Sequence, residues 1–233
     1  MLTWQFIIAL ILTAIVSYLL GSCNSAIIVC KLWKKTDIRS VGSKNAGLTN
    51  TYRVFGKGPA LVTLAGDLAK GVIAVLISRL MFNLLDVGIP FGNGFEMDTR
   101  FVGYIAGFFA IIGHIFPVFY RFKGGKGVLV SCSILLVIDP LAFSILIPFF
   151  ALIVILTRYV SVASITAAIA YPIVTFVTQT LRGYPNVLLN TILVVFTSAL
   201  LVYMHKPNIK RLKEGTENKF GSKKISEEIK KEE

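Results

Sequence analysis

Residues 101–138 read FVGYIAGFFAIIGHIFPVFYRFKGGKGVLVSCSILLVI. An apolar run at 101–120 is followed by the short basic segment RFKGGK at 121–126 and then by a second apolar run. About 20 consecutive apolar residues are enough for a helix to cross the hydrocarbon of a bilayer. Because backbone groups in hydrocarbon must satisfy one another, both runs are predicted to be membrane helices joined by a basic connector.

The same pattern extends along the chain in both directions. Hydrophobic residues make up 55% of 233 residues and charged residues only 15%, with a mean hydropathy of +0.75. A soluble domain usually carries about a quarter charged residues. We therefore expect an all-α integral membrane protein with seven transmembrane helices, at 4–29, 59–82, 101–120, 127–138, 141–157, 159–180 and 187–204.

The fourth and fifth spans depend on the pair Asp139–Pro140. A single helix over residues 127–157 would be about 45 Å long, whereas the hydrocarbon core is about 30 Å thick. Proline breaks a helix interior, and a carboxylate favours water. A tight helical hairpin is therefore predicted here.

The net charge of +12 is carried mainly by short connectors, which argues against a nucleic-acid-binding face. Seven Lys or Arg lie in 31–57, three in 121–126 and nine after Tyr203, whereas the opposite connectors hold only Arg100 and Arg182. Since positive loops stay in the cytosol, the N-terminus is predicted outside and the C-terminus inside. Residues 1–213 would form the membrane domain, and 214–233 a polar cytosolic tail.

Two cytosolic loops have the composition of anion-binding sites. Residues 42–50, GSKNAGLTN, precede Arg53 and are rich in glycine and side-chain donors, although an ordinary polar turn is the alternative. The segment KGGKG at 123–127 precedes a helix, whose N-terminal end favours a phosphate. It lacks the hydroxyl residue that binds magnesium in a nucleotide-binding loop. We therefore expect this segment to bind a phosphate group but not a nucleotide. A loop that binds only lipid headgroups is the alternative.

Other polar residues are spaced for a helix face. His205 and Asn208, three residues apart, share one face of a helix. Asp67 and Lys70 have the same spacing within the second span. Charges in a membrane helix usually pair inside the bundle, so a structural ion pair is expected, with support of the site as the alternative.

At these loops the sequence resembles the bacterial membrane acyl-phosphate:glycerol-3-phosphate acyltransferases. The family's second motif matches 113–119 and 122–128 without a gap, and its third matches His205 to Glu217. The resemblance covers about residues 18–220. Asn24 and Ala26 stand where Pro and Gly are usual, and Lys44 replaces a common Gly. The first motif matches Gly42, Ser43, Asn45, Gly47, Asn50 and Arg53.

This resemblance implies transfer of a fatty acyl group from acyl phosphate to the 1-position of glycerol 3-phosphate, giving lysophosphatidate and phosphate, at the cytosolic face of a bacterial cell membrane. A soluble cytosolic enzyme would supply the acyl phosphate, and no cofactor or metal is expected. The catalytic residues would be Ser43, Arg53, Lys126, His205 and Asn208. Phosphate binding would use Gly42, Asn45, Gly47, Asn50, Lys123, Gly124, Gly125 and Gly127, with structural support from Asp67, Lys70, His114 and Glu217.

Three alternatives are weaker. A transporter for phosphorylated solutes would favour a site at the membrane midplane, whereas the cations here lie at one face. The His-x4-Asp pair of soluble-type glycerol-phosphate acyltransferases is absent, since Phe119 and Lys210 stand five residues after the two histidines. The five Asp are too scattered for a metal-dependent phosphotransferase. Because no general base is evident, the substrate's own phosphate is expected to take the hydroxyl proton.

Overall fold

The structure, a computed structural model, describes residues 4–85 and 99–221. Most of the connector predicted between the second and third spans, at 83–100, falls beyond these residues. The helices are α1 (Trp4–Ser22), α2 (Ser25–Lys34), α3 (Leu48–Phe55), α4 (Lys57–Leu84), α5 (Thr99–Ile115), the 3₁₀ turn η1 (Val118–Tyr120), α6 (Val128–Ile138), α7 (Pro140–Thr157), α8 (Val160–Leu181), α9 (Val187–Met204) and α10 (Lys206–Lys213).

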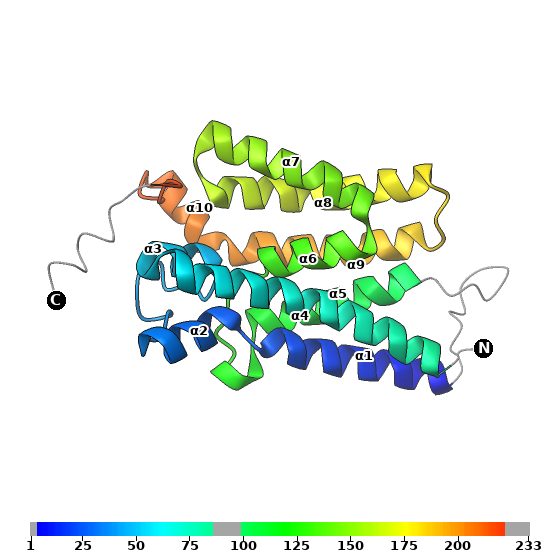
Figure 1. Ribbon diagram of the computed structural model, residues 1–233. Coiled ribbons are helices and arrows are strands. Elements are labelled where there is room, and N and C mark those ends of the chain that lie inside the picture. Colours follow the sequence, from blue (N-terminus) through cyan, green and yellow to red (C-terminus); the bar gives the residue numbers. More distant parts are fainter. Residues whose placement is uncertain (1–3, 86–98, 222–233) are drawn as a thin grey trace, which may run out of the picture.

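The long helices form two halves of one bundle (Figure 1). Helices α1, α4 and α5 pack together, α8 packs between α7 and α9, and α6 lies against α4 and α5. Glycines of α5 allow close packing against α6, since a Cβ at Gly103 would lie 2.4 Å from the Ile138 side chain and a Cβ at Gly107 would lie 2.6 Å from that of Ile134. The short helices α2, α3 and α10 gather at one end of the bundle (Figure 1).

The prediction of an all-helical integral membrane protein is confirmed for the described residues. Six helical segments there are long and apolar enough to cross a membrane. Their outer faces expose apolar side chains, such as Ile155 and Leu156 of α7, which are 74% and 70% exposed. The predicted fourth span corresponds to α6, which has only 11 residues, or about 16 Å at 1.5 Å per residue. Seven crossings therefore stay a prediction.

The first predicted span is interrupted within its length. Helix α1 ends at Ser22, and the Asn24 side chain accepts a hydrogen bond from the Ile27 N–H at 3.1 Å. This N-cap starts the separate helix α2 at Ser25. The third predicted span also ends early, at Ile115, because Pro117 disfavours a helical conformation in the residue before it.

The predicted break at Asp139–Pro140 is confirmed. Asp139 caps α7 by accepting a hydrogen bond from the Ala142 N–H at 3.1 Å. The expectation that this carboxylate seeks water was wrong, because Asp139 is only 2% exposed. Thr178 and Gln179 of α8 donate to its second oxygen at 3.4 and 3.2 Å and replace water.

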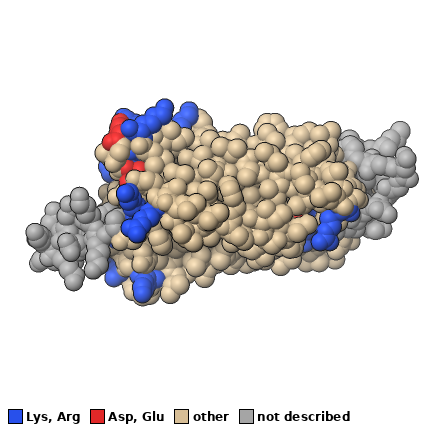
Figure 2. Space-filling model, turned by 90° about the horizontal axis from the view of Figure 1, so that it is seen from above, with Lys and Arg blue, Asp and Glu red and all other residues tan. Residues whose placement is uncertain are grey.

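Basic residues are unevenly distributed over the described surface. Figure 2 shows Lys and Arg gathered at one end of the face that it draws, with a smaller group near the other end. Lys31 belongs to α2, Arg39 to the segment between α2 and α3, and Arg211 to α10, at the end where these short helices lie (Figure 1). The two glycine-rich loops of the sequence meet at that end.

Candidate active site

A cavity of about 500 Å³ opens among the loops and helices at this end. Its polar part is lined by Ser43, Asn45, Arg53, Lys126, His205, Asn208, Arg211 and Glu217. Its apolar part is lined by Leu129, Leu136, Phe143, Ile147 and Phe150, which come from α6 and α7. One continuous space therefore joins cationic groups to a hydrocarbon-like wall.

Asn50 organises the first loop. Its amide nitrogen donates to the carbonyl oxygens of Ile38, Val41 and Asn45 at 3.2, 3.1 and 3.1 Å. Its amide oxygen accepts a hydrogen bond from the Ser43 N–H at 2.8 Å. The side chain of Asn50 thus serves the shape of the loop, while Ser43 and Asn45 line the cavity.

The glycine pair of the second loop packs onto the end of α5. The Gly124 N–H donates to the Ile115 carbonyl at 3.0 Å, and the Gly125 N–H donates to the His114 carbonyl at 3.1 Å. The prediction that these two N–H groups are free for a phosphate was wrong, because the last carbonyls of a helix also need partners. A Cβ at Gly125 would lie 2.2 Å from His114 Nε2, so only glycine fits there.

Lys126 and the start of α6 follow this turn directly. Gly127 caps α6 with φ at +84°, a left-handed conformation that favours glycine. Gly127, Val128 and Leu129 line the cavity, so the positive end of α6 faces it. The Lys126 ammonium donates a hydrogen bond to Asn208 Oδ1.

Glu217 holds the third segment of the site together. Its Oε1 accepts hydrogen bonds from Ser161 Oγ at 2.8 Å and Asn208 Nδ2 at 2.7 Å, and its Oε2 accepts from Arg211 Nε at 2.7 Å. Burial alone would raise the pKa of this carboxyl, but the hydrogen bonds together lower it. Glu217 is therefore an ionised support for Asn208, and residues beyond 213 belong to the site.

His205 presents a hydrogen-bond acceptor. Its Nδ1 lies 2.7 Å from the Leu201 carbonyl oxygen, which can only accept, so Nδ1 carries the hydrogen. Burial, and then the charge of Lys126, lower the pKa of His205 to about 4. The ring is consequently neutral at pH 7, and its Nε2 offers a lone pair.

Positive charge dominates the polar part of the cavity. Burial lowers the pKa of Lys126 to about 8, and the nearby Arg211 and Arg53 act in the same direction. Burial also lowers the pKa of Arg53, whose Nη2 donates to the Asn218 carbonyl at 3.3 Å. Cations that repel one another in a partly buried space are stabilised by a bound anion.

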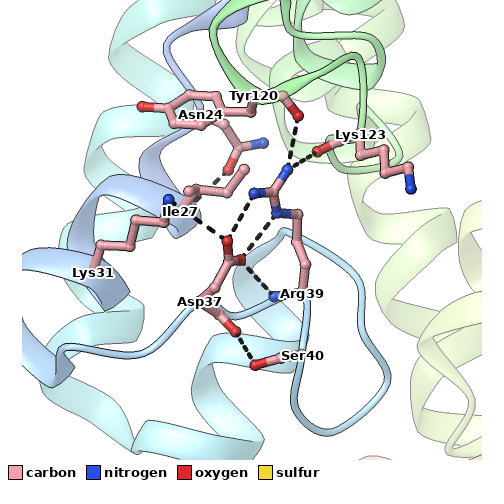
Figure 3. Close-up of polar contacts among 8 residues, drawn as sticks. All are labelled: Asn24, Ile27, Lys31, Asp37, Arg39, Ser40, Tyr120 and Lys123. Atoms are coloured by element: carbon pink, nitrogen blue, oxygen red, sulfur yellow. Dashed lines mark hydrogen bonds and ion pairs between the residues drawn. The ribbon is translucent and has the colours of Figure 1, made fainter.

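Arg39 joins the two loops, as Figure 3 shows. Its Nη1 donates to the carbonyl oxygens of Tyr120 and Lys123 at 2.8 and 3.1 Å. Asp37 holds the guanidinium at 3.0 Å from Nε and 2.7 Å from Nη2. In the sequence, Arg39 is only one of the seven Lys or Arg of the segment 31–57. An acidic residue two positions before it was the available signal.

Most of the residues predicted for the site meet in the cavity. Those that do not line it are Gly42, Lys70, Lys123, Gly124 and Gly125. The Lys123 ammonium points away from the Arg39 cluster in Figure 3. Lining residues that the sequence did not single out include Ser161, Ser164, Cys132 and Arg211. The predicted residues that line the cavity are Ser43, Asn45, Gly47, Asn50, Arg53, Asp67, His114, Lys126, Gly127, His205, Asn208 and Glu217.

Comparison with known proteins agrees with this geometry. Residues 11–215 match the family model described as glycerol-3-phosphate acyltransferase. A glycerol-3-phosphate acyltransferase of Clostridioides difficile (strain 630) is 38% identical over 218 residues, 94% of this chain and 98% of that protein. One of Syntrophotalea carbinolica is 41% identical over 204 residues, 88% of this chain and 94% of that protein.

Two solved structures share the fold. Both are of PlsY (YgiH), an integral membrane glycerol 3-phosphate acyltransferase. Its glycerol 3-phosphate form has a TM-score of 0.74 and 34% identity, covering 91% of this chain and 96% of that one. Its lysophosphatidic acid form has a TM-score of 0.72 and 32% identity, covering 93% of this chain and 97% of that one.

Proposed function

The chain belongs to the glycerol-3-phosphate acyltransferase family, and from that premise we propose that it transfers a fatty acyl group from acyl phosphate to the 1-hydroxyl of glycerol 3-phosphate. The products would be lysophosphatidate and phosphate, in the first step of phospholipid synthesis. The observation that carries this proposal is the two-part cavity, in which Arg53 and Lys126 adjoin the apolar wall of Leu136 and Phe143. A phosphorylated acceptor and a long acyl chain require these two surroundings together.

The polar part would bind two phosphates. Lys126 and the N-terminal end of α6, with Gly127, would bind one of them. Ser43, Asn45 and Arg53 would bind the other and orient the carbonyl that is attacked. Acyl phosphate is already activated, so positioning and charge stabilisation can supply most of the acceleration.

His205 and the departing phosphate would handle the proton. The Nε2 lone pair of His205 accepts a hydrogen bond from the attacking hydroxyl and directs its oxygen at the carbonyl carbon. With a pKa of about 4, the ring is too weak a base to keep the proton. As the new C–O bond forms and the bond to phosphate breaks, the proton leaves with the phosphate. Asn208, held by Glu217, keeps Lys126 in place.

The apolar part would hold the acyl chain. Phe143, Ile147 and Phe150 of α7 face Leu129 and Leu136 of α6 across the cavity. Helix α7 is otherwise largely exposed and apolar, so this wall continues into the lipid-facing surface. A donor dissolved in the membrane can then reach the site without leaving hydrocarbon.

We place the protein in a bacterial cell membrane with seven crossings, the N-terminus outside and the active site in the cytosol. The fourth crossing, for which α6 alone is short, would be completed by α6 together with the loop at 121–127, since irregular backbone is tolerated at membrane depth where it lines a cavity. A soluble cytosolic enzyme would supply the acyl phosphate. Labelling single cysteines placed at Lys44 and Gly183 from either side of sealed vesicles tests this orientation.

The decisive assay uses the purified protein in vesicles with palmitoyl phosphate and glycerol 3-phosphate. Equal amounts of lysophosphatidate and phosphate are expected, and Lys126→Met is expected to abolish both. Palmitoyl-CoA in place of palmitoyl phosphate is expected to give no product. Uptake of glycerol 3-phosphate without lysophosphatidate would favour a transporter, and product only from the thioester would refute the proposed donor.

A further inference from the structure

A buried polar cluster lies beneath the two loops. Asp67 and Lys70 of α4 and His114 of α5 are 1%, 6% and 3% exposed. We propose, on the basis of the function proposed above, that this cluster positions the Gly124–Gly125 turn and thereby Lys126, so that Lys70 is a positioning residue for the reaction although it does not line the cavity.

Lys70 joins three parts of the fold through one ammonium. Its Nζ lies 2.8 Å from Asp67 Oδ1 and 2.7 Å from His114 Nδ1, and it donates to the Cys23 carbonyl at 3.3 Å. The contacts with His114 and Cys23 are hydrogen bonds, and the contact with Asp67 is an ion pair. Cys23 lies in the break between α1 and α2, so α4, α5 and that break are held at one point.

The ammonium also fixes the state of His114. Because Lys70 can only donate, His114 Nδ1 accepts, and the hydrogen of the neutral ring is on Nε2. Nε2 lies on the far side of the ring, against Gly125, where a Cβ would come within 2.2 Å of it. The ring held by Lys70 is therefore the surface on which the glycine turn rests.

The first loop reaches the same point. A Cβ at Gly125 would also lie 2.5 Å from the carbonyl oxygen of Ala46, which is fully buried. Asn24, the residue after Cys23, donates to that same carbonyl at 3.4 Å. Gly125 is thus enclosed between the His114 ring and the first loop, and the cluster under Lys70 sets the relative position of both loops.

The consequence concerns the residue that follows the turn. Gly124 and Gly125 donate to the last carbonyls of α5, and Lys126 comes next in the chain with its ammonium on Asn208. A shift of the His114 ring would move the turn, and the Lys126 ammonium would move with it. A displacement of about 1 Å at a reacting group can cost up to about 100-fold in rate.

The test separates positioning from simple stability. Lys70→Met leaves the Asp67 carboxylate buried without its partner, which lowers the melting temperature. The double variant Asp67→Asn/Lys70→Met removes both charges and is expected to recover most of that loss. It still lacks the bonds to His114 and Cys23, so the KM for glycerol 3-phosphate should stay about 10- to 100-fold above the wild-type value, with a smaller change in kcat. Lys57→Met, an exposed lysine on the same helix, is the matched control.

Hydrogen exchange of the peptide covering 116–127 gives a second readout that needs no activity. Faster exchange at the glycine turn is expected in the double variant and unchanged exchange in Lys57→Met. Normal KM or normal exchange in the folded double variant would overturn the proposal. If the double variant does not fold, His114→Asn, which keeps an acceptor for Lys70 but removes the ring from Gly125, is judged by the same two outcomes. A wild-type protein that makes no lysophosphatidate would refute the proposed function, whereas the exchange result would still decide the role of the cluster.

Discussion

His114 and His205 line the same cavity with opposite ring nitrogens protonated. His114 Nδ1 accepts from the Lys70 ammonium at 2.7 Å, which puts its hydrogen on Nε2. His205 Nδ1 donates to the Leu201 carbonyl at 2.7 Å, which leaves its Nε2 as an acceptor. One ring thus supports the glycine turn and the other offers a lone pair, so substitutions at the two positions should have different effects.

Replacing His205 tests the role of its lone pair. His205→Gln places an amide oxygen near the position of Nε2 and should retain part of the activity. His205→Ala should lower kcat by about 10²- to 10⁴-fold, the range for a group that assists proton transfer. The measurement is kcat at saturating acyl phosphate and glycerol 3-phosphate. Equal losses in the two variants would argue that the acceptor does not matter.

Lys126 should give the reaction an alkaline limit. Its pKa, lowered to about 8, means that the ammonium is present below pH 8 and is lost as pH rises above it. The expected result is a fall of kcat/KM for glycerol 3-phosphate above about pH 8, because this ratio reports the free enzyme. Lys126→Arg is the control, since arginine stays charged and should remove this limit even if its activity is lower. A limit at the same pH in Lys126→Arg would assign it to another group.

Arg39 should matter through the second loop. Arg39→Met leaves the Tyr120 and Lys123 carbonyls without their donor and frees the turn before Gly124. We expect the KM for glycerol 3-phosphate to rise by about tenfold, which corresponds to about 1.4 kcal/mol. Lys31→Met is the control, because Lys31 also pairs with Asp37 but at 3.7 Å and with half of its side chain exposed. It should change the KM for glycerol 3-phosphate little. Similar effects in both variants would indicate a general loss of surface charge.

Cys132 should influence the choice of acyl chain. It belongs to α6 and lines the apolar part of the cavity together with Ile147 and Phe150. Cys132→Trp would fill part of that space and is expected to favour shorter acyl phosphates, measured as kcat/KM over a series of chain lengths. Leu152→Trp on the exposed side of α7 is the control and should leave the series unchanged. An unchanged series in Cys132→Trp would place the chain elsewhere.

The sequence predicted the meeting of the loops better than their internal contacts. Ser43, Lys126 and His205 were expected at one face because alternating spans return the chain to it, and all three line the cavity. The alternation of spans does not predict the hydrogen-bond partners of individual N–H groups. Glycines before a helix indicate that another group approaches the backbone closely. Only the packed turn shows that the Gly125 N–H donates to the His114 carbonyl rather than to a ligand.

Buried polar groups were the least predictable feature. Asp139 was correctly expected to break a helix, because its position beside Pro140 is a local signal. Its burial depends on Thr178 and Gln179, which α8 supplies from far along the chain. Glu217 is similar, since Ser161 and Arg211 converge on it only in the folded bundle. Such contacts are set by tertiary packing, which local periodicity does not encode.

The cavity that joins cationic residues to an apolar wall also decides how substrate supply is measured. Under the proposed function, glycerol 3-phosphate arrives from water, so its concentration is measured per volume of solution. The acyl donor arrives through the bilayer beside α7, so its concentration is measured per area of membrane. Inert lipid added at a constant total amount of donor would therefore slow the reaction. The rate would therefore depend on the fraction of acyl donor in the same membrane to which the product is added.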